Sequence, residues 1–190
     1  MNLKYHIVNE NQLKTFIPDL RSMEKNIEYP LEDGTESFFI DHGKDYSPFF
    51  TQQGYKTRFL IITNKDKVAG SIAGVWKRIS FNEKTYNALY ASDLKLKPKY
   101  RNKGIVKKFL WFLFIRWPFT KEFQGWDFIY FCAMQKKNKG VESSFKGVHL
   151  GKLTRPNCIL NIYILEPQKL NNIDLDELQY YPENEINLSP

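Results

Sequence analysis

The sequence predicts an α/β (α+β) fold with a mixed, mostly antiparallel central sheet flanked by helices. Three β-type apolar runs, residues 58–63, 68–79 and 85–96, are joined by short polar turns and predict an antiparallel meander. Apolar residues at helical spacing follow in 107–117, and another apolar strand follows in 128–133. A strand, helix and strand in this order require a right-handed crossover, so the last strand should run parallel to its partner.

The other segments complete the expected order β-α-α-β-β-β-α-β-α-β over roughly residues 3 to 165. A short strand opens the chain, a helix follows, and the Pro- and Gly-interrupted segment 24–57 should hold one or two short helices. Its aromatic residues either line a substrate side of the domain or form satellite core beneath a loop. The remaining expected elements are strand 5–8, helix 9–20, helix 137–145, and strands 149–153 and 157–164.

The charge distribution divides the chain into a basic domain, residues 1–165, and an acidic polar tail or linker, residues 166–190. The formal net charge is +7, but the segment from Ile164 onward carries six acids against one lysine. That segment is −5, and the rest of the chain is therefore +12. The basic part is either a Lys-rich solvated surface or a surface that binds an anion such as a phosphorylated cofactor, a nucleic acid or a lipid headgroup.

The expected compartment is the cytoplasm. Met1 is followed by polar residues and not by the apolar core of a signal peptide. The apolar run 109–119 is interrupted by Arg116 and is too short to span a bilayer. Two cysteines are too few for a disulfide framework, and the absence of Cys/His metal spacing predicts no metal site.

A strand, a basic glycine turn and a helix follow one another between residues 91 and 117. Leu94 and Leu96 alternate with Asp93 and Lys95, so the two pairs should lie on opposite faces of a strand. Pro98 ends that strand because it has no N–H to donate. Free N–H groups and the positive end of the helix dipole should then meet at residues 101–106, which predicts an anion site.

The turn Arg101-Asn102-Lys103-Gly104-Ile105-Val106 resembles the pyrophosphate-binding loop of the GNAT superfamily of N-acetyltransferases. That loop has the pattern Arg/Gln-x-x-Gly-x-Gly/Ala, and Val106 departs from it with a side chain that crowds the approach to phosphate. The resemblance implies acetyl-CoA as cosubstrate, with backbone groups of the preceding strand holding the pantetheine. Asn138 matches a pantetheine-side asparagine, although a helix N-cap is the simpler reading.

The residues that the resemblance assigns to CoA are Leu94, Lys95, Leu96, Arg101, Asn102, Lys103, Gly104, Ile105, Val106 and Asn138. The basic side chains expected to attract the adenosine 3′-phosphate are those of Lys95, Lys97, Lys99, Arg101, Lys103, Lys107 and Lys108.

Two residues are candidates for proton transfer. Asp93 is the nearest carboxylate to the expected cleft and would act as the base that deprotonates an amine, or would only pair with Lys95 or an arginine. In the resembled family a tyrosine often protonates the thiolate, and that position here is Phe145. Tyr130 and Tyr163 substitute for it by residue type alone, and Tyr130 is taken as the candidate acid.

The function expected from these residues is transfer of acetyl from acetyl-CoA to a primary amine, by direct attack in a ternary complex. A small amine, a peptide N-terminus and a lysine side chain fit equally as acceptor. One alternative, suggested by Val106 and Phe145, is a CoA-binding module without turnover. Another is a nucleic-acid or membrane-surface binder, which ranks last because the basic residues concentrate at one turn. Neither nucleic acid nor a membrane span is expected.

Overall fold

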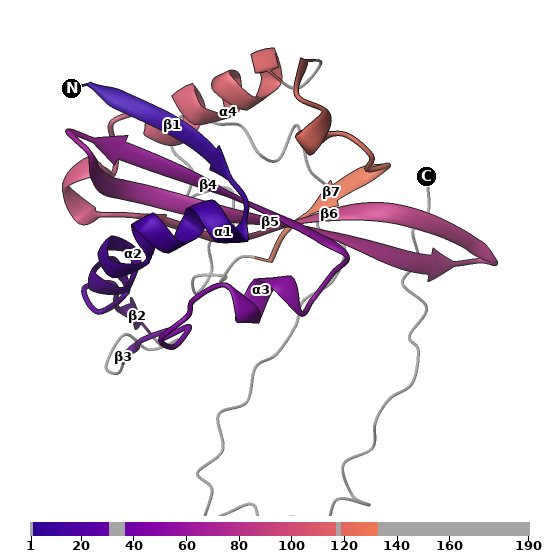
Figure 1. Cartoon of the computed structure of the whole chain (residues 1–190), viewed down its shortest axis with the longest axis horizontal. Helices are drawn as coiled ribbons and strands as arrows, with labels where there is room; N and C mark the ends of the chain where they lie inside the picture. Colours follow the sequence, from indigo (N-terminus) through magenta and orange to yellow (C-terminus); the bar gives the residue numbers. More distant parts are fainter. Residues whose placement is uncertain (1, 31–36, 117–118, 133–190) are drawn as a thin grey trace, which may run out of the picture. The chain divides into compact units, whose positions relative to one another are not determined.

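The computed structural model describes residues 2–30, 37–116 and 119–132, which form a five-stranded sheet with helices on both faces (Figure 1). The spatial strand order is β1-β4-β5-β6-β7. Neighbouring strands are antiparallel except β6 and β7, which are parallel. This confirms the predicted mixed, mostly antiparallel sheet and its parallel last strand. The strands are β1 Leu3–Val8, β4 Lys56–Asn64, β5 Lys67–Phe81, β6 Lys84–Leu96 and β7 Phe128–Tyr130.

Both hairpin turns of the meander are built from two residues with positive φ. Lys65 and Asp66 have φ of 50° and 60°, and Asn82 and Glu83 have φ of 45° and 61°. Two consecutive left-handed residues match the right-handed twist of the flanking strands, as in type I′ turns. The turns lie where the sequence predicts them, so β4, β5 and β6 pair in the expected order.

The single helix predicted over residues 9–20 is interrupted in the structure and ends later. Asn9 caps α1 (Glu10–Leu13) in a capping box with Gln12, as the sequence suggests. The chain then tightens into η1 (Lys14–Phe16) before α2 (Ile17–Glu24). Pro18 explains the break, because it has no N–H and its ring clashes with the carbonyl four residues earlier.

The segment between α2 and β4 holds one short helix and an additional strand pair. β2 (Tyr29–Pro30) and β3 (Ser37–Phe38) form a two-residue antiparallel ladder, and α3 (Pro48–Thr51) follows. The β2–β3 pair was not predicted, because two-residue strands leave no periodic signal. The predicted helix 137–145, the later strands and the boundary at residue 165 lie outside the described residues.

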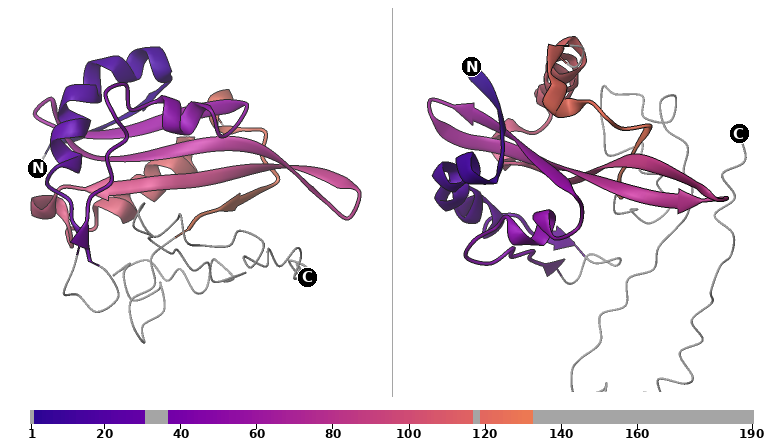
Figure 2. Two further views of the ribbon diagram at one scale, coloured as in Figure 1. Left: turned by 90° about the horizontal axis from the view of Figure 1, so that it is seen from below. Right: turned by 45° about the vertical axis from the view of Figure 1, so that its right-hand side comes forward.

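The two faces of the sheet carry separate hydrophobic cores. Helices α1, α2 and α3 cover one face, and α4 (Ile105–Arg116) covers the other (Figures 1 and 2). The first core includes Leu13, Leu20, Met23, Tyr46, Phe50 and Phe59, and the second includes Leu60, Ile62, Tyr100, Ile105 and Phe109. Short helical turns η2 (Pro98–Tyr100) and η4 (Lys121–Phe123) flank α4. Ile105 anchors the first turn of α4 in its core and so fixes where the helix begins.

Two irregularities in the ladders lie beside the basic turn. The β4–β5 register shifts after Ile62, opposite Gly70, where an added Cβ would meet the Lys95 carbonyl oxygen at 2.6 Å. The backbone of β6 therefore lies too close to Gly70 for a side chain. The β5–β6 register shifts between Ser71 and Ala73, which places two residues of β6 opposite one of β5. One of these two residues is Asp93.

Candidate active site

The basic turn ends at the N-terminus of α4, as the sequence predicts. Asn102 and Gly104 have φ of 59° and 67°, and α4 begins at Ile105. The Lys108 N–H donates to the Gly104 carbonyl at 3.0 Å, so the N–H groups of the three residues before it point out of the helix end. A Cβ on Gly104 would meet nothing within 4 Å. Gly104 is therefore required for its backbone conformation and not for space.

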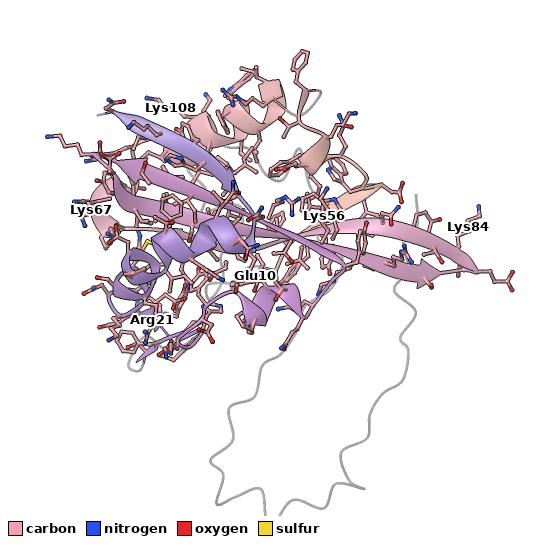
Figure 3. All side chains as sticks on the ribbon, viewed as in Figure 1. Glu10, Arg21, Lys56, Lys67, Lys84 and Lys108 are labelled. Atoms are coloured by element: carbon pink, nitrogen blue, oxygen red, sulfur yellow. The ribbon has the colours of Figure 1, made fainter. Side chains whose placement is uncertain are left out.

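Most of the basic side chains around this turn are free of carboxylates. Lys103, Lys107 and Lys108 are exposed, and no ion pair involves them within the described part of the chain. Lys108 is labelled in Figure 3. The Arg101 Nε donates to the Leu96 carbonyl at 3.1 Å, which ties the turn to the end of β6. Val106 is half-buried in the first turn of α4. Together, the helix end and these cations form a surface that suits phosphate.

Lys95 does not belong to this set, contrary to the expectation that its side chain attracts the 3′-phosphate. The side chain is buried on the opposite face of the sheet, where its Nζ lies 2.7 Å from the Asp93 carboxylate and 2.5 Å from that of Glu24. An ammonium group held by two carboxylates is not available to a phosphate. The alternation predicted for this strand explains the result, because Leu96 packs into the core beneath α4 and Lys95 must face the other way.

The sheet opens beside β6. β7 pairs with β6 only at Ala88, Leu89 and Tyr90, and in the described residues no strand pairs with the outer edge of 91–96. The backbone of Leu94, Lys95 and Leu96, assigned to pantetheine by the resemblance, lies on this unpaired stretch. Its CoA role is a prediction. Asn138 and Phe145 lie outside the described residues.

Asp93 occupies the bulge in β6 with a left-handed backbone, φ 57°. Its two carboxylate oxygens have different partners: one accepts from the Tyr46 hydroxyl at 2.6 Å, and the other lies 2.7 Å from the Lys95 Nζ. Asp93 therefore pairs with Lys95, and whether this is its only role stays a prediction. Its role as a base remains a prediction. Strained backbones of this kind often mark functional sites.

The network extends from Lys95 to Glu24 at the end of α2, and from Glu24 to His42. Glu24 is hydrogen-bonded to the His42 Nδ1 and lies 2.5 Å from the Lys95 Nζ. The side chains of Lys95, Glu24, His42 and Asp93 are 1%, 3%, 3% and 7% exposed, so the whole network is buried. We call these four residues and Tyr46 the buried ion network.

Sequence reasoning did not find Glu24, His42 or Tyr46. Tyr46 and Glu24 lie 47 and 71 residues from their partners on β6, and His42 lies 18 residues from Glu24, so only tertiary contacts reveal them. His42 packs against the rings of Tyr46, Phe49 and Phe50 at centroid distances of 5.1, 4.7 and 4.9 Å. The aromatic segment 37–55 is thus partly core, as one alternative stated, and partly the wall of a polar site.

The burial of the network shifts the pKa values of its members. Burial by itself would raise the pKa of Glu24, but hydrogen bonds from His42 and Lys95 hold it below its usual value. Burial would lower the pKa of Lys95, and the Asp93 and Glu24 carboxylates reverse this and raise it. Burial, and then the charge of Asp93, raise the pKa of Tyr46 far above its usual value. Near neutral pH, Tyr46 is therefore a hydrogen-bond donor that orients Asp93.

The network could be mistaken for a metal site. Ligand atoms of Glu24, His42 and Asp93 lie within 4.8 Å of one another. However, the Lys95 Nζ is in direct contact with two of the three groups and supplies the positive charge that a cation would bring. These residues are therefore better explained as an internal ion network than as metal ligands.

We expect the stability of the protein to fall in acid through Glu24. Its folded-state pKa lies below the unfolded value of about 4.3, so its contribution is complete above that pH and is lost as the pH falls through the lowered pKa. Urea unfolding at steps from about pH 6 to about pH 3 should show a flatter dependence for Glu24→Gln than for the wild type. Glu122→Gln, on an exposed pair with Arg58, should follow the wild type. Parallel curves for all three proteins would contradict this assignment.

Tyr130, the candidate acid, ends β7 and stacks on Tyr90 at 4.9 Å between ring centroids. Burial, and then the neighbouring Tyr90 and Cys132, raise its pKa, so the phenol is protonated at neutral pH. Tyr90 is the last residue of β6 paired with β7, so Tyr130 stands where the sheet opens. Its position is compatible with proton donation, and the role itself is a prediction.

Comparison with known proteins gives matches among solved structures only. No protein-family model matches the sequence, and a search of curated proteins gives no match either. An acetyltransferase from Trypanosoma brucei aligns with a TM-score of 0.53 at 12% identity, covering 87% of this chain and 100% of that one. A transcriptional regulator from Bacillus halodurans C-125 aligns at 0.54 and 8% identity, with coverages of 87% and 100%. AAC(6′)-Iy, solved with a CoA-containing bisubstrate analogue, aligns at 0.53 and 14% identity, with coverages of 87% and 99%.

These matches and the topology define the class of fold. The chain has the GNAT acyltransferase fold. This fold is seen here as a meander, a bulged strand that ends in a basic glycine turn, a helix and a parallel last strand. No helix within the described residues has the length and apolar character needed to cross a membrane.

Proposed function

We propose that the protein is an acyl-CoA-dependent N-acyltransferase that transfers acetyl from acetyl-CoA to a primary amine by direct attack in a ternary complex. One observation carries the proposal. A single strand, β6, leads from the bulge that holds the buried Asp93 carboxylate to the turn before α4, and no strand among the described residues pairs with its outer edge between the two. This arrangement suits an extended cosubstrate with a phosphate end and a reactive thioester end.

The CoA end would be held by the turn and the strand. The N–H groups of residues 102–106 would donate to the pyrophosphate, and the free cations Lys103, Lys107 and Lys108 would attract the 3′-phosphate. The unpaired backbone of Leu94, Lys95 and Leu96 would bind the amide groups of the pantetheine as an added strand does.

The acyl transfer needs one proton acceptor and one donor. Asp93 would take a proton from the acceptor ammonium, the amine nitrogen would bond to the thioester carbonyl carbon, and the carbon–sulfur bond would then break. Tyr130 would protonate the departing thiolate, and its phenolate would then take the second proton from the nitrogen as the amide forms. Tyr46 and Lys95 would position Asp93 without touching the substrate.

The neighbours with known ligands agree with this proposal at the level of the fold. AAC(6′)-Iy is shown with an analogue that joins CoA to an acetylated amine. A glucosamine-6-phosphate N-acetyltransferase from Arabidopsis thaliana has a TM-score of 0.50 at 15% identity. The proposal adds a cytoplasmic location, which rests on the sequence alone.

We expect Gly104→Glu to weaken acetyl-CoA binding by at least about tenfold. A side chain at φ 67° strains the turn, and a carboxylate there opposes the phosphates. Calorimetric titration of acetyl-CoA, CoA and dephospho-CoA would measure this, and loss of the 3′-phosphate should also weaken binding. Gly125→Glu is the matched control, because Gly125 also has a positive φ, 85°, and an open surrounding, but lies between η4 and β7. Absence of binding heat for the wild type would contradict the proposed function.

A CoA-binding module without turnover is the second candidate. Val106, half-buried at the start of α4, favours it, because a side chain replaces the small residue of the GNAT loop. Acetyl transfer to any amine would exclude this candidate. Acetyl-CoA binding without transfer across a broad amine panel would favour it.

A further inference from the structure

An open pocket of about 440 Å³ lies between the end of α3 and the middle of β5. Its lining includes the amide of Gln53, the phenols of Tyr55 and Tyr130, and two adjacent cations, Lys77 and Arg78. The backbone forms part of the wall at Gly54, where an added Cβ would meet the Trp76 carbonyl oxygen at 2.3 Å. The pocket wall is thus set by backbone contact as well as by side chains.

The two cations in this pocket contact neutral groups among the described residues. The Lys77 Nζ donates to the neutral Gln53 Oε1 at 3.2 Å and lies 4.8 Å from the Tyr90 ring centroid. The Arg78 guanidinium lies over the Tyr55 ring at 5.4 Å. Among residues 2–30, 37–116 and 119–132, no carboxylate pairs with either cation, whereas Lys4, Arg58, Lys67 and Lys95 each have one. Within the part of the chain that the structure describes, the pocket therefore presents two positive charges without a paired carboxylate.

The pocket borders the opening of the sheet. Tyr130 lines it and stacks on Tyr90, the last β6 residue that pairs with β7. Asp93 follows Tyr90 three residues later on the same strand, and Tyr90 packs against the core face that holds the buried ion network. The residues that line the pocket do not include any residue of the basic turn 101–106, so a molecule bound there would leave that turn free.

We infer that this pocket binds the anionic group of the acceptor, which is a primary amine that also carries a carboxylate or a phosphate. This inference rests on the proposed function and names its substrate class. Arg78 offers a planar fork that matches either anion, and Lys77 adds a second charge. The amine of such an acceptor would then extend toward Asp93.

Matched acceptor pairs test the inference. O-phosphoethanolamine and ethanolamine are compared as acceptors because they differ only in the phosphate. In the same way, 4-aminobutyrate and its amide differ only in the carboxylate charge. At least one anionic member should have a kcat/KM about tenfold or more above that of its neutral partner. Arg78→Gln and Lys77→Gln should remove this preference. Lys84→Gln is the control, because it removes the same charge at the tip of the β5–β6 hairpin (Figure 3). This variant should keep the preference for anionic acceptors. Equal or higher rates for the neutral members would overturn the inference.

A binding measurement makes the result independent of turnover. Both anionic amines are titrated calorimetrically, at millimolar concentrations, into wild type and Arg78→Gln saturated with CoA, or into the free proteins if CoA does not bind. Binding that is lost in Arg78→Gln supports the inference, and no binding to the wild type overturns it. Failure of acetyl-CoA to bind would instead count against the proposed function, so the two failures are distinguishable.

Discussion

Lys95→Met is expected to lower the free energy of unfolding by about 3–5 kcal/mol, because it leaves buried carboxylates without their cation. Lys95 contacts both Glu24 and Asp93, and its own side chain is 1% exposed. Methionine fills a similar volume but brings no charge, so the two acids would repel each other in an apolar surrounding. Urea unfolding, with the midpoint and the slope fitted separately, would measure the loss.

Lys67→Met is the matched control for that experiment. Lys67 also pairs with a carboxylate, Asp19, but at 3.8 Å and with 78% of its side chain exposed (Figure 3). Exposed pairs contribute about 0–1 kcal/mol, so this variant should stay close to the wild type. Similar decreases in the free energy of unfolding for the two variants would show that the buried ion pairs of Lys95 stabilise the protein no more than the exposed pair of Lys67.

Asp93→Asn is expected to reduce kcat by about 10²–10⁴-fold, the usual contribution of a positioned general base. An amide in the same place keeps the shape and can still accept from the Tyr46 hydroxyl, but it cannot take a proton from an ammonium group. Binding of acetyl-CoA should be unchanged, because the turn at Gly104 is not altered. Steady-state kinetics would measure kcat, and calorimetry on the same preparations would measure the affinity for acetyl-CoA.

Two further variants show whether the loss is chemical or structural. Tyr46→Phe removes the hydroxyl that orients Asp93 and should lower kcat by roughly tenfold with little change in KM for acetyl-CoA. Glu122→Gln removes an exposed carboxylate and should leave kcat unchanged. If Asp93→Asn keeps the wild-type kcat, Asp93 is only an ion-pair partner of Lys95.

The sequence by itself predicted the elements whose residues are neighbours along the chain. The meander follows from apolar runs and two polar turns, and the parallel β7 follows from the handedness of a strand–helix–strand crossover. The order of a glycine turn and an apolar helix was also predicted, although α4 begins at Ile105, two residues before the predicted start at Lys107. Pro18 is itself a local signal for the break in the first helix. The prediction nevertheless gave one helix over residues 9–20, because it followed the helical periodicity.

Only the tertiary structure decided what the charged side chains do. In sequence Lys95 is one of seven basic residues near the turn, yet strand alternation and the bulge at Asp93 direct it into a buried network with Glu24. Likewise Lys77 and Arg78 resemble surface cations until α3 and β7 place Gln53, Tyr55 and Tyr130 around them. The physical reason is the same in both cases. Backbone conformation depends on local sequence, whereas the partners and burial of a charge depend on residues that the fold brings from elsewhere in the chain.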